Sequence, residues 1–81
     1  MDKTTITEKV RQILVSVLKH EKFEMRDDLT AQDVAGWDSL THMLIITEIE
    51  DSFNFKFKLK ELNKLKNMGT LIEAIQSKQN N

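Results

Sequence analysis

Apolar residues recur every three or four positions in this chain, and that spacing is typical of helices that bury one face. The pattern is clearest near the start, where Thr5 and Glu8 also have the spacing of a capping box. We therefore predict a first helix over residues 5–19. Its apolar positions are Ile6, Val10, Ile13, Leu14, Val17 and Leu18.

Three later stretches complete a helical pattern. We predict helices over residues 39–53, 60–66 and 68–77, with Asn67 as the cap of the last one and fraying from Ser77 onward. The stripe of the second helix is Ile45, Ile46, Ile49 and Phe53, the short third helix presents Leu62 and Leu65, and the last helix presents Met68, Leu71, Ile72 and Ile75.

One short segment, residues 54–60, has the alternation of a strand instead. Phe55, Phe57 and Leu59 alternate with Lys56, Lys58 and Lys60. Since no second segment of this kind is present to pair with it, a strand here would leave its backbone hydrogen bonds unmade. We interpret it as an extended connector whose phenylalanines fill the core and whose lysines stay in water.

The long polar segment of residues 20–37 is predicted to be a loop held to the core by Phe23, Leu29 and Val34, with a short turn at residues 30–34. The expected fold is all-α, a small four-helix bundle with three long helices, a short third helix and a long loop between the first two. We expect one domain over residues 1–81.

Length and composition limit what such a chain can do. With 81 residues and 40% apolar content, it has little room for an enclosed active site. It has no cysteine, so disulfides and thiolate metal sites are excluded, and no apolar run near the roughly 20 residues that span a bilayer. We expect a soluble, cytoplasmic monomer.

Charge is unevenly distributed along the chain. Residues 21–54 hold nine acidic and two basic residues, a net charge of −7, whereas residues 55–81 hold six lysines and two glutamates, a net charge of +4. The acidic stretch therefore suits a positively charged partner, although an ordinary solvated surface has the same composition.

The run Gly36-Trp37-Asp38-Ser39-Leu40 places one serine, directly after an acid, at the start of the second predicted helix. Leu40, Met43 and Leu44 add apolar surface beyond the one stripe that a bundle requires. This excess fits a partner-binding surface and, equally well, a helix buried on two sides.

Three other functions fit poorly. The Gly-Asp-Ser-Leu hydrolase motif is interrupted by Trp37, and 81 helical residues lack the scaffold for a triad, so we interpret His42 as an exposed histidine rather than a base. His20 lies at the end of the first predicted helix, where a cation suits the helix dipole, and we expect no further role for it. We do not expect catalysis.

Metal and nucleic-acid binding are also disfavoured. Asp27, Asp28 and Asp33 lack the order of a calcium loop, so we expect no metal site. Lysines and phenylalanines do alternate in residues 55–60, as on surfaces that stack nucleic-acid bases, but the chain is net acidic and its core needs the phenylalanines. We therefore expect no nucleic-acid partner.

Phosphate attachment at Ser39 fits better, because a helix N-terminus offers unpaired N–H groups and a positive dipole, worth about 0.3 to 1 kcal/mol for a nearby anion. Asp38 then has two possible roles. It caps the helix, or it offers a carboxylate to a metal-dependent modifying enzyme.

At these residues the chain resembles the acyl, peptidyl and aminoacyl carrier proteins. Asp38-Ser39-Leu40 resembles their attachment motif, and residues 48–53 resemble their acidic run before a phenylalanine. The resemblance extends over nearly the whole chain, including the first helix, the loop with Leu29, the short third helix and the last helix.

The resemblance implies that Ser39 carries 4'-phosphopantetheine, transferred from coenzyme A by a magnesium-dependent phosphopantetheinyl transferase. It implies that the arm holds an acyl or aminoacyl thioester and delivers it to enzymes of the ligase, ketosynthase or acyltransferase type. Docking would be weak and electrostatically steered. The implied docking residues are Asp38, Leu40, Met43, Leu44, Glu48, Glu50 and Asp51.

Three positions depart from fatty-acid carriers. Thr41 and Leu44 stand where acids are common, and residues 56–60 are basic where such carriers are often acidic and contain proline. We therefore expect a dedicated pathway, such as polysaccharide, lipid-modifying or secondary-metabolite synthesis, rather than housekeeping fatty-acid synthesis. The alternative from another class is an unmodified helical interaction adaptor.

Overall fold

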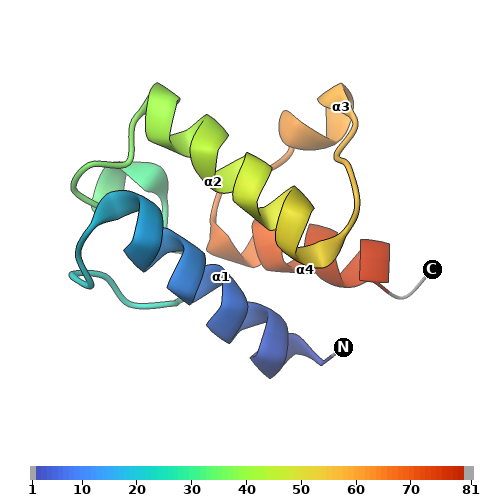
Figure 1. Ribbon diagram of the computed structural model, residues 1–81, viewed down its shortest axis with the longest axis horizontal. Coiled ribbons are helices and arrows are strands. Elements are labelled where there is room, and N and C mark those ends of the chain that lie inside the picture. The colour runs from blue at the N-terminus through green and yellow to red at the C-terminus, as the bar shows by residue number, and fades with distance from the viewer. Residues whose placement is uncertain (1, 80–81) are drawn as a thin grey trace.

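A computed structural model describes residues 2–79. It contains four α-helices and one short 3₁₀ helix in this part of the chain (Figure 1). In chain order they are α1 (Lys3–Leu18), the 3₁₀ helix η1 (Ala31–Asp33), α2 (Ser39–Phe53), α3 (Leu59–Leu62) and α4 (Met68–Gln79). The prediction of an all-α fold with a short third helix is confirmed.

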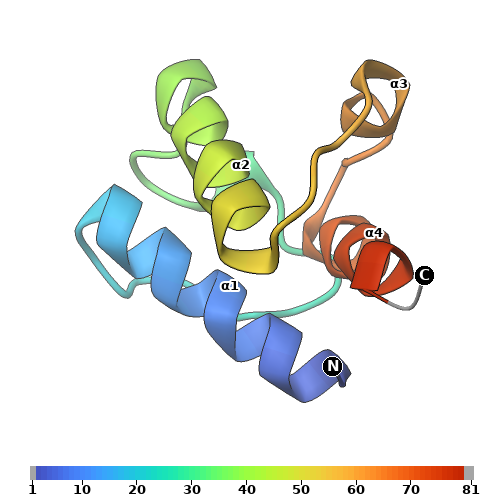
Figure 2. The same cartoon turned by 45° about the vertical axis from the view of Figure 1, so that its right-hand side comes forward.

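The core lies where α1 meets α2 and α4. Figure 2 shows α1 running below α2 and beside α4, with α3 set apart above α4. Every predicted apolar position of the first helix is buried except Val17, which is partly exposed. The most deeply buried side chains, each under 2% exposed, are Ile6, Val10, Leu14, Ile45, Ile49, Ile72 and Ile75.

Helix α1 begins earlier than predicted. Asp2, not Thr5, is its N-cap, and the Asp2 Oδ1 atom accepts a hydrogen bond of 2.8 Å from the Thr5 backbone N–H. The predicted box of Thr5 and Glu8 was wrong because an aspartate three residues before Thr5 already caps the helix. Lys19 ends it in the left-handed conformation, with φ of 67°.

The long loop is fastened to α4 rather than only to its neighbours. The Met68 and Gly69 N–H groups donate to the Leu29 and Asp27 carbonyls at 2.8 and 2.9 Å. A Cβ atom on Gly69 would lie 3.1 Å from the Asp27 carbonyl oxygen, a tight contact that glycine avoids. Leu29 is 3% exposed, and its predicted role as a loop anchor is confirmed.

The predicted turn at residues 30–34 is also confirmed. Thr30 and Asp33 form a capping box around η1, with the Thr30 N–H donating to Asp33 Oδ2 at 3.1 Å. Val34 is buried and Phe23 is partly buried against the core.

The extended connector, predicted over residues 54–60, covers residues 54–58, because Leu59 and Lys60 already belong to α3. Within it Phe57 is buried, Phe55 is half-buried and the lysines are exposed. Helix α3 is shorter than the predicted 60–66. It ends at Leu62, since the chain then continues in turns in which the Lys64 and Leu65 N–H groups donate to Glu61 and Leu62 carbonyls.

Fraying was predicted from Ser77 onward, but α4 continues to Gln79. The Gln79 side chain donates to the Phe53 carbonyl at 2.9 Å, and Lys78 pairs with Glu61 at 3.0 Å. These contacts hold the helix to Gln79, and the rest of the predicted frayed segment, residues 80 and 81, lies outside the described residues. At the other end, Asn67 caps α4 as predicted, because its Oδ1 accepts from the Thr70 N–H at 2.9 Å.

Among residues 2–79, no helix is both long enough and apolar enough to cross a lipid bilayer.

Candidate functional site

Ser39 is the first residue of α2 and is exposed. Asp38 precedes it as the N-cap, with its Oδ1 accepting from the Thr41 N–H at 3.0 Å. In return, the Thr41 hydroxyl oxygen accepts a hydrogen bond from the Asp38 backbone N–H at 2.8 Å. This reciprocal capping box fixes the backbone on both sides of Ser39 while leaving the serine itself open to solvent.

The cap also sets the charge of the site. The hydrogen bond from the Thr41 backbone N–H holds the pKa of the Asp38 carboxyl below its usual value. Asp38 is therefore an exposed carboxylate at neutral pH, and its interpretation as a helix cap is confirmed.

A glycine turn delivers the chain to this helix. Gly36 has φ of 84°, a left-handed conformation that favours glycine, and its carbonyl accepts from the Thr41 hydroxyl at 2.7 Å. One residue earlier, the Ala35 carbonyl accepts from His20 Nε2 at 2.6 Å. Since His20 Nδ1 accepts from the Lys22 N–H, His20 joins the two ends of the long loop. The sequence prediction of a helix-end role for His20 missed this.

His42 is half-buried, so its prediction as an exposed histidine was wrong. The Trp37 Nε1–H donates to His42 Nδ1 at 3.1 Å, and the two rings stack with their centroids 6.1 Å apart. Burial lowers the pKa of His42 from its usual 6.5, which favours the neutral ring. The contact joins Trp37, just before the Asp38 cap, to the fourth residue of α2.

The same bond argues against Ser39 as a catalytic nucleophile. The indole N–H is only a donor, so Nδ1 of His42 is the acceptor and the neutral ring carries its proton on Nε2. A triad histidine needs the reverse arrangement, with Nδ1–H on a carboxylate and an unprotonated Nε2. His42 therefore cannot serve Ser39 as a base in this form.

Trp37 and His42 line two hollows. An open surface hollow of about 460 Å³ is bordered by Ser39, and a smaller, partly open pocket has a volume of about 50 Å³. The surface hollow is lined by Ala31, Trp37, Asp38, Ser39, His42 and Met43. The smaller pocket has room for one or two water molecules only, and Leu29, Leu65 and Leu71 are among its lining residues.

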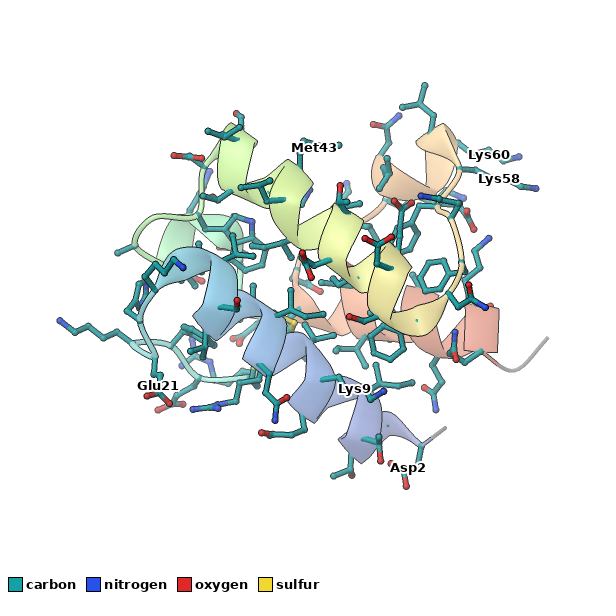
Figure 3. All side chains as sticks on the ribbon, viewed as in Figure 1. Asp2, Lys9, Glu21, Met43, Lys58 and Lys60 are labelled. Atoms are coloured by element: carbon teal, nitrogen blue, oxygen red, sulfur yellow. The ribbon has the colours of Figure 1, made fainter. Side chains whose placement is uncertain are left out.

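Beside Ser39, α2 exposes three large apolar side chains. Leu40, Met43 and Leu44 are 72%, 52% and 49% exposed. Figure 3 shows Met43 projecting from α2 on the side away from α1, while Lys58 and Lys60 project from the region of α3. Of the two interpretations of this apolar surface, burial between neighbouring helices is therefore wrong.

The acids of α2 divide into two kinds. Glu48 and Asp51 are exposed. The Glu50 side chain is only 14% exposed, and its Oε2 accepts from the Phe57 backbone N–H at 2.8 Å. Glu50 was predicted as a docking acid, and the structure instead gives it the task of holding the connector against α2.

Two aspartates of the long loop pair with basic side chains. Across residues 2–79, no three carboxylate or histidine side chains are grouped so as to hold a metal ion. Asp27 and Asp28 pair with Lys3 and Arg26 at 3.9 and 3.1 Å.

A comparison with protein families assigns the chain to a family. Residues 8–75 match the model of the phosphopantetheine attachment site family. The chain belongs to this family. It is thus a carrier protein of the acyl carrier family rather than an enzyme, and the cofactor of the family is covalently attached 4'-phosphopantetheine.

The carrier protein is also similar to a solved structure, the solution structure of holo acyl carrier protein from Geobacter metallireducens. The two superpose with a TM-score of 0.83 at 33% sequence identity, over 90% of this chain and 84% of the other. At this level of superposition the two proteins share one fold.

Proposed function

We propose that Ser39 is the residue that carries 4'-phosphopantetheine, and that the arm holds an acyl or aminoacyl group as a thioester. The observation that carries this proposal is the position of Ser39, exposed at the first residue of α2 beside an open hollow. The remaining serines lie inside helices, at Ser16 in α1, Ser52 in α2 and Ser77 in α4. A phosphodiester fits at Ser39, since the cap leaves its hydroxyl open to an incoming transferase.

The surface beside Ser39 supports weak docking to modifying and biosynthetic enzymes. Leu40, Met43 and Leu44 offer apolar contact, and Asp38, Glu48 and Asp51 offer exposed carboxylates for a basic patch. The partners we propose are a phosphopantetheinyl transferase and enzymes of the ligase, ketosynthase or acyltransferase type, meeting a monomeric carrier domain in the cytoplasm.

The cargo pathway we propose is a dedicated one. The Thr41 hydroxyl forms hydrogen bonds with Asp38 and Gly36 at the helix cap, and this side chain presents no charge to a partner. Leu44 presents an apolar surface instead of an acid, and the lysines of residues 56–60 are exposed. Partners selected for these features differ from those of a uniformly acidic carrier.

Intact mass tests the attachment residue. The protein is incubated with a broad-specificity phosphopantetheinyl transferase, coenzyme A and magnesium, and one phosphopantetheine increment is expected. Ser39→Ala should gain none, whereas Ser52→Ala, a matched change on the same helix, should gain the increment in full. An increment that survives in Ser39→Ala would overturn the assignment.

The same experiment separates the alternative function, an interaction adaptor that is never modified. This alternative predicts no increment in any variant, including the unaltered protein. The pathway is tested separately, by malonyl transfer from malonyl-coenzyme A with a fatty-acid malonyltransferase. We expect the holo protein to be a much poorer acceptor than a housekeeping carrier, and equal rates would contradict the dedicated role.

A further inference from the structure

His42 carries a hydrogen-bond donor that the fold does not use. Its Nδ1 accepts from the Trp37 indole, so the proton of the neutral ring is on Nε2. Among residues 2–79, no side chain or carbonyl accepts a hydrogen bond from this Nε2, and the atom is not sealed from solvent. The ring itself is held in place by stacking on Trp37. The result is a donor with a fixed ring and a vacant partner position.

The donor belongs to the same surface as Ser39. The two residues are three positions apart on α2, so their side chains lie on one face of the helix. Both also line the open hollow of about 460 Å³. A group attached to the Ser39 hydroxyl therefore begins within the hollow that His42 borders.

We propose that the His42 Nε2–H donates a hydrogen bond to the phosphodiester of the arm on Ser39, so that the Trp37–His42 pair is a positioning element that directs the arm out of the helix. This inference rests on the proposed modification of Ser39. In this role His42 acts as a hydrogen-bond donor, not as the general base that a hydrolase would need.

The phosphodiester is favoured over a carbonyl farther along the arm for two reasons. It is bonded directly to the serine oxygen, so its position is limited to the neighbourhood of the first turn. It is also an anion, and hydrogen bonds to charged acceptors are roughly twice as strong as those between neutral groups. The cargo thioester, at the far end of a flexible arm, has neither advantage.

Two other charged groups face this pair of rings. Asp38 borders the hollow from the first turn, but its Oδ1 is engaged by the Thr41 N–H. Lys66, from the segment between α3 and α4, lines the smaller pocket that the two rings also line. Both are present before and after loading, so a change in His42 on loading reports the arm.

Histidine titration by NMR in the apo and holo protein tests the contact, with complete loading first verified by intact mass. Protonated His42 gains a nearby anion in the holo form, so its pKa should rise by roughly half a pH unit or more on loading. The chain's second histidine is an internal control. His20 is bonded to Ala35 and Lys22 and should not change. An unchanged His42, or equal changes in both histidines, would overturn the inference.

Salt separates a hydrogen bond from a distant charge effect. At about 1 M NaCl the screening length is about 3 Å, so the rise in the His42 pKa should persist only for direct contact.

Phosphorus NMR of the holo protein observes the same contact from the phosphodiester. The phosphodiester resonance should follow the His42 titration, and in His42→Asn, whose amide still accepts from Trp37 but is too short to reach the arm, it should become independent of pH. A phosphorus titration that is absent from the unaltered protein, or that survives in His42→Asn, would contradict the contact. Failure to load would instead refute the proposed function.

Discussion

Helices α1 and α2 pack against each other but differ in what they leave outside. Every exposed residue of α1 is polar or charged: Lys3, Thr4, Thr5, Glu8, Lys9, Gln12 and Ser16. Helix α2 instead exposes Leu40, Met43 and Leu44 near its start and keeps its buried stripe for Ile45, Ile46, Ile49 and Phe53. Both helices stabilise the fold, but of the two only α2 leaves large apolar side chains exposed.

The difference continues within α2. Its N-terminal turns carry Ser39, the Trp37–His42 contact and the exposed apolar residues, while its C-terminal turns are fastened by Glu50 to the connector and by Phe53 to α4. Lys9 of α1 also lies 5.6 Å from the centre of the Phe53 ring. Ser39 thus lies at the end of α2 opposite to the contacts with the connector and α4.

The largest effect should come from truncating a buried side chain of α2, and an exposed side chain of the same helix gives the comparison. Ile49 is 0% exposed, so Ile49→Ala should reduce the free energy of unfolding by about 2 to 5 kcal/mol. Leu44→Ala, at 49% exposure, should change it by less than about 1 kcal/mol. Urea unfolding followed by circular dichroism measures both, and similar losses would show that Leu44 belongs to the core.

Charge reversal tests whether α2 alone is the docking helix. Glu48→Lys with Asp51→Lys should reduce kcat/KM for the phosphopantetheinyl transferase by roughly five- to tenfold at low salt, with a smaller loss at high salt. The control, Glu73→Lys, reverses an exposed acid on α4 and should leave the rate unchanged. Equal losses in the two proteins would mean that net charge, not this surface, guides docking.

A pH effect smaller than these should come from the start of α2. Burial lowers the pKa of folded His42 below its unfolded value of about 6.5, so the unfolded chain binds a proton first as pH falls. Stability is therefore complete above about pH 6.5 and should decrease as pH falls from there toward the folded pKa. In His42→Gln, the unfolding free energy should depend less on pH below about 6.5, and an unchanged slope would contradict this origin.

The caps of the two helices predict a separate change at lower pH. Asp2 and Asp38 each accept from a threonine N–H, which lowers the pKa of both carboxyls. Their stabilisation is present above the usual value of 3.8 and is lost as pH falls through the lowered folded pKa values. Asp38→Asn, which keeps a capping oxygen, should weaken this acid loss in a pH series of thermal melts, and an identical series would argue against the cap.

Sequence periodicity was enough to predict the helix order, because each long helix buries one stripe that is visible at three- and four-residue spacing. It was not enough to predict the start of α1 or the end of α3, where neighbouring caps and turns compete over a few residues. The capping aspartate at Asp2 was a readable signal that was overlooked in favour of Thr5 and Glu8.

The site divides in the same way. Ser39 and the possibility of an Asp38 cap were evident from the run of residues 36–40. The excess of apolar residues on α2 was also evident, but the sequence left open whether they are exposed or buried. The inward turn of Glu50 depends on the Phe57 amide, and the burial of His42 depends on Trp37 and on the segment between α3 and α4. Such contacts between segments leave no periodic pattern in the sequence.

The central claim is that Ser39, rather than any other serine of this carrier, bears the arm. Tryptic cleavage after Arg26 and Lys56 leaves Ser39 and Ser52 in one peptide, so fragmentation of that peptide from the loaded protein is the most direct test. We predict that fragments containing Ser39 but not Ser52 carry the phosphopantetheine mass. An increment found only on fragments that contain Ser52, or on a different peptide, would contradict the account.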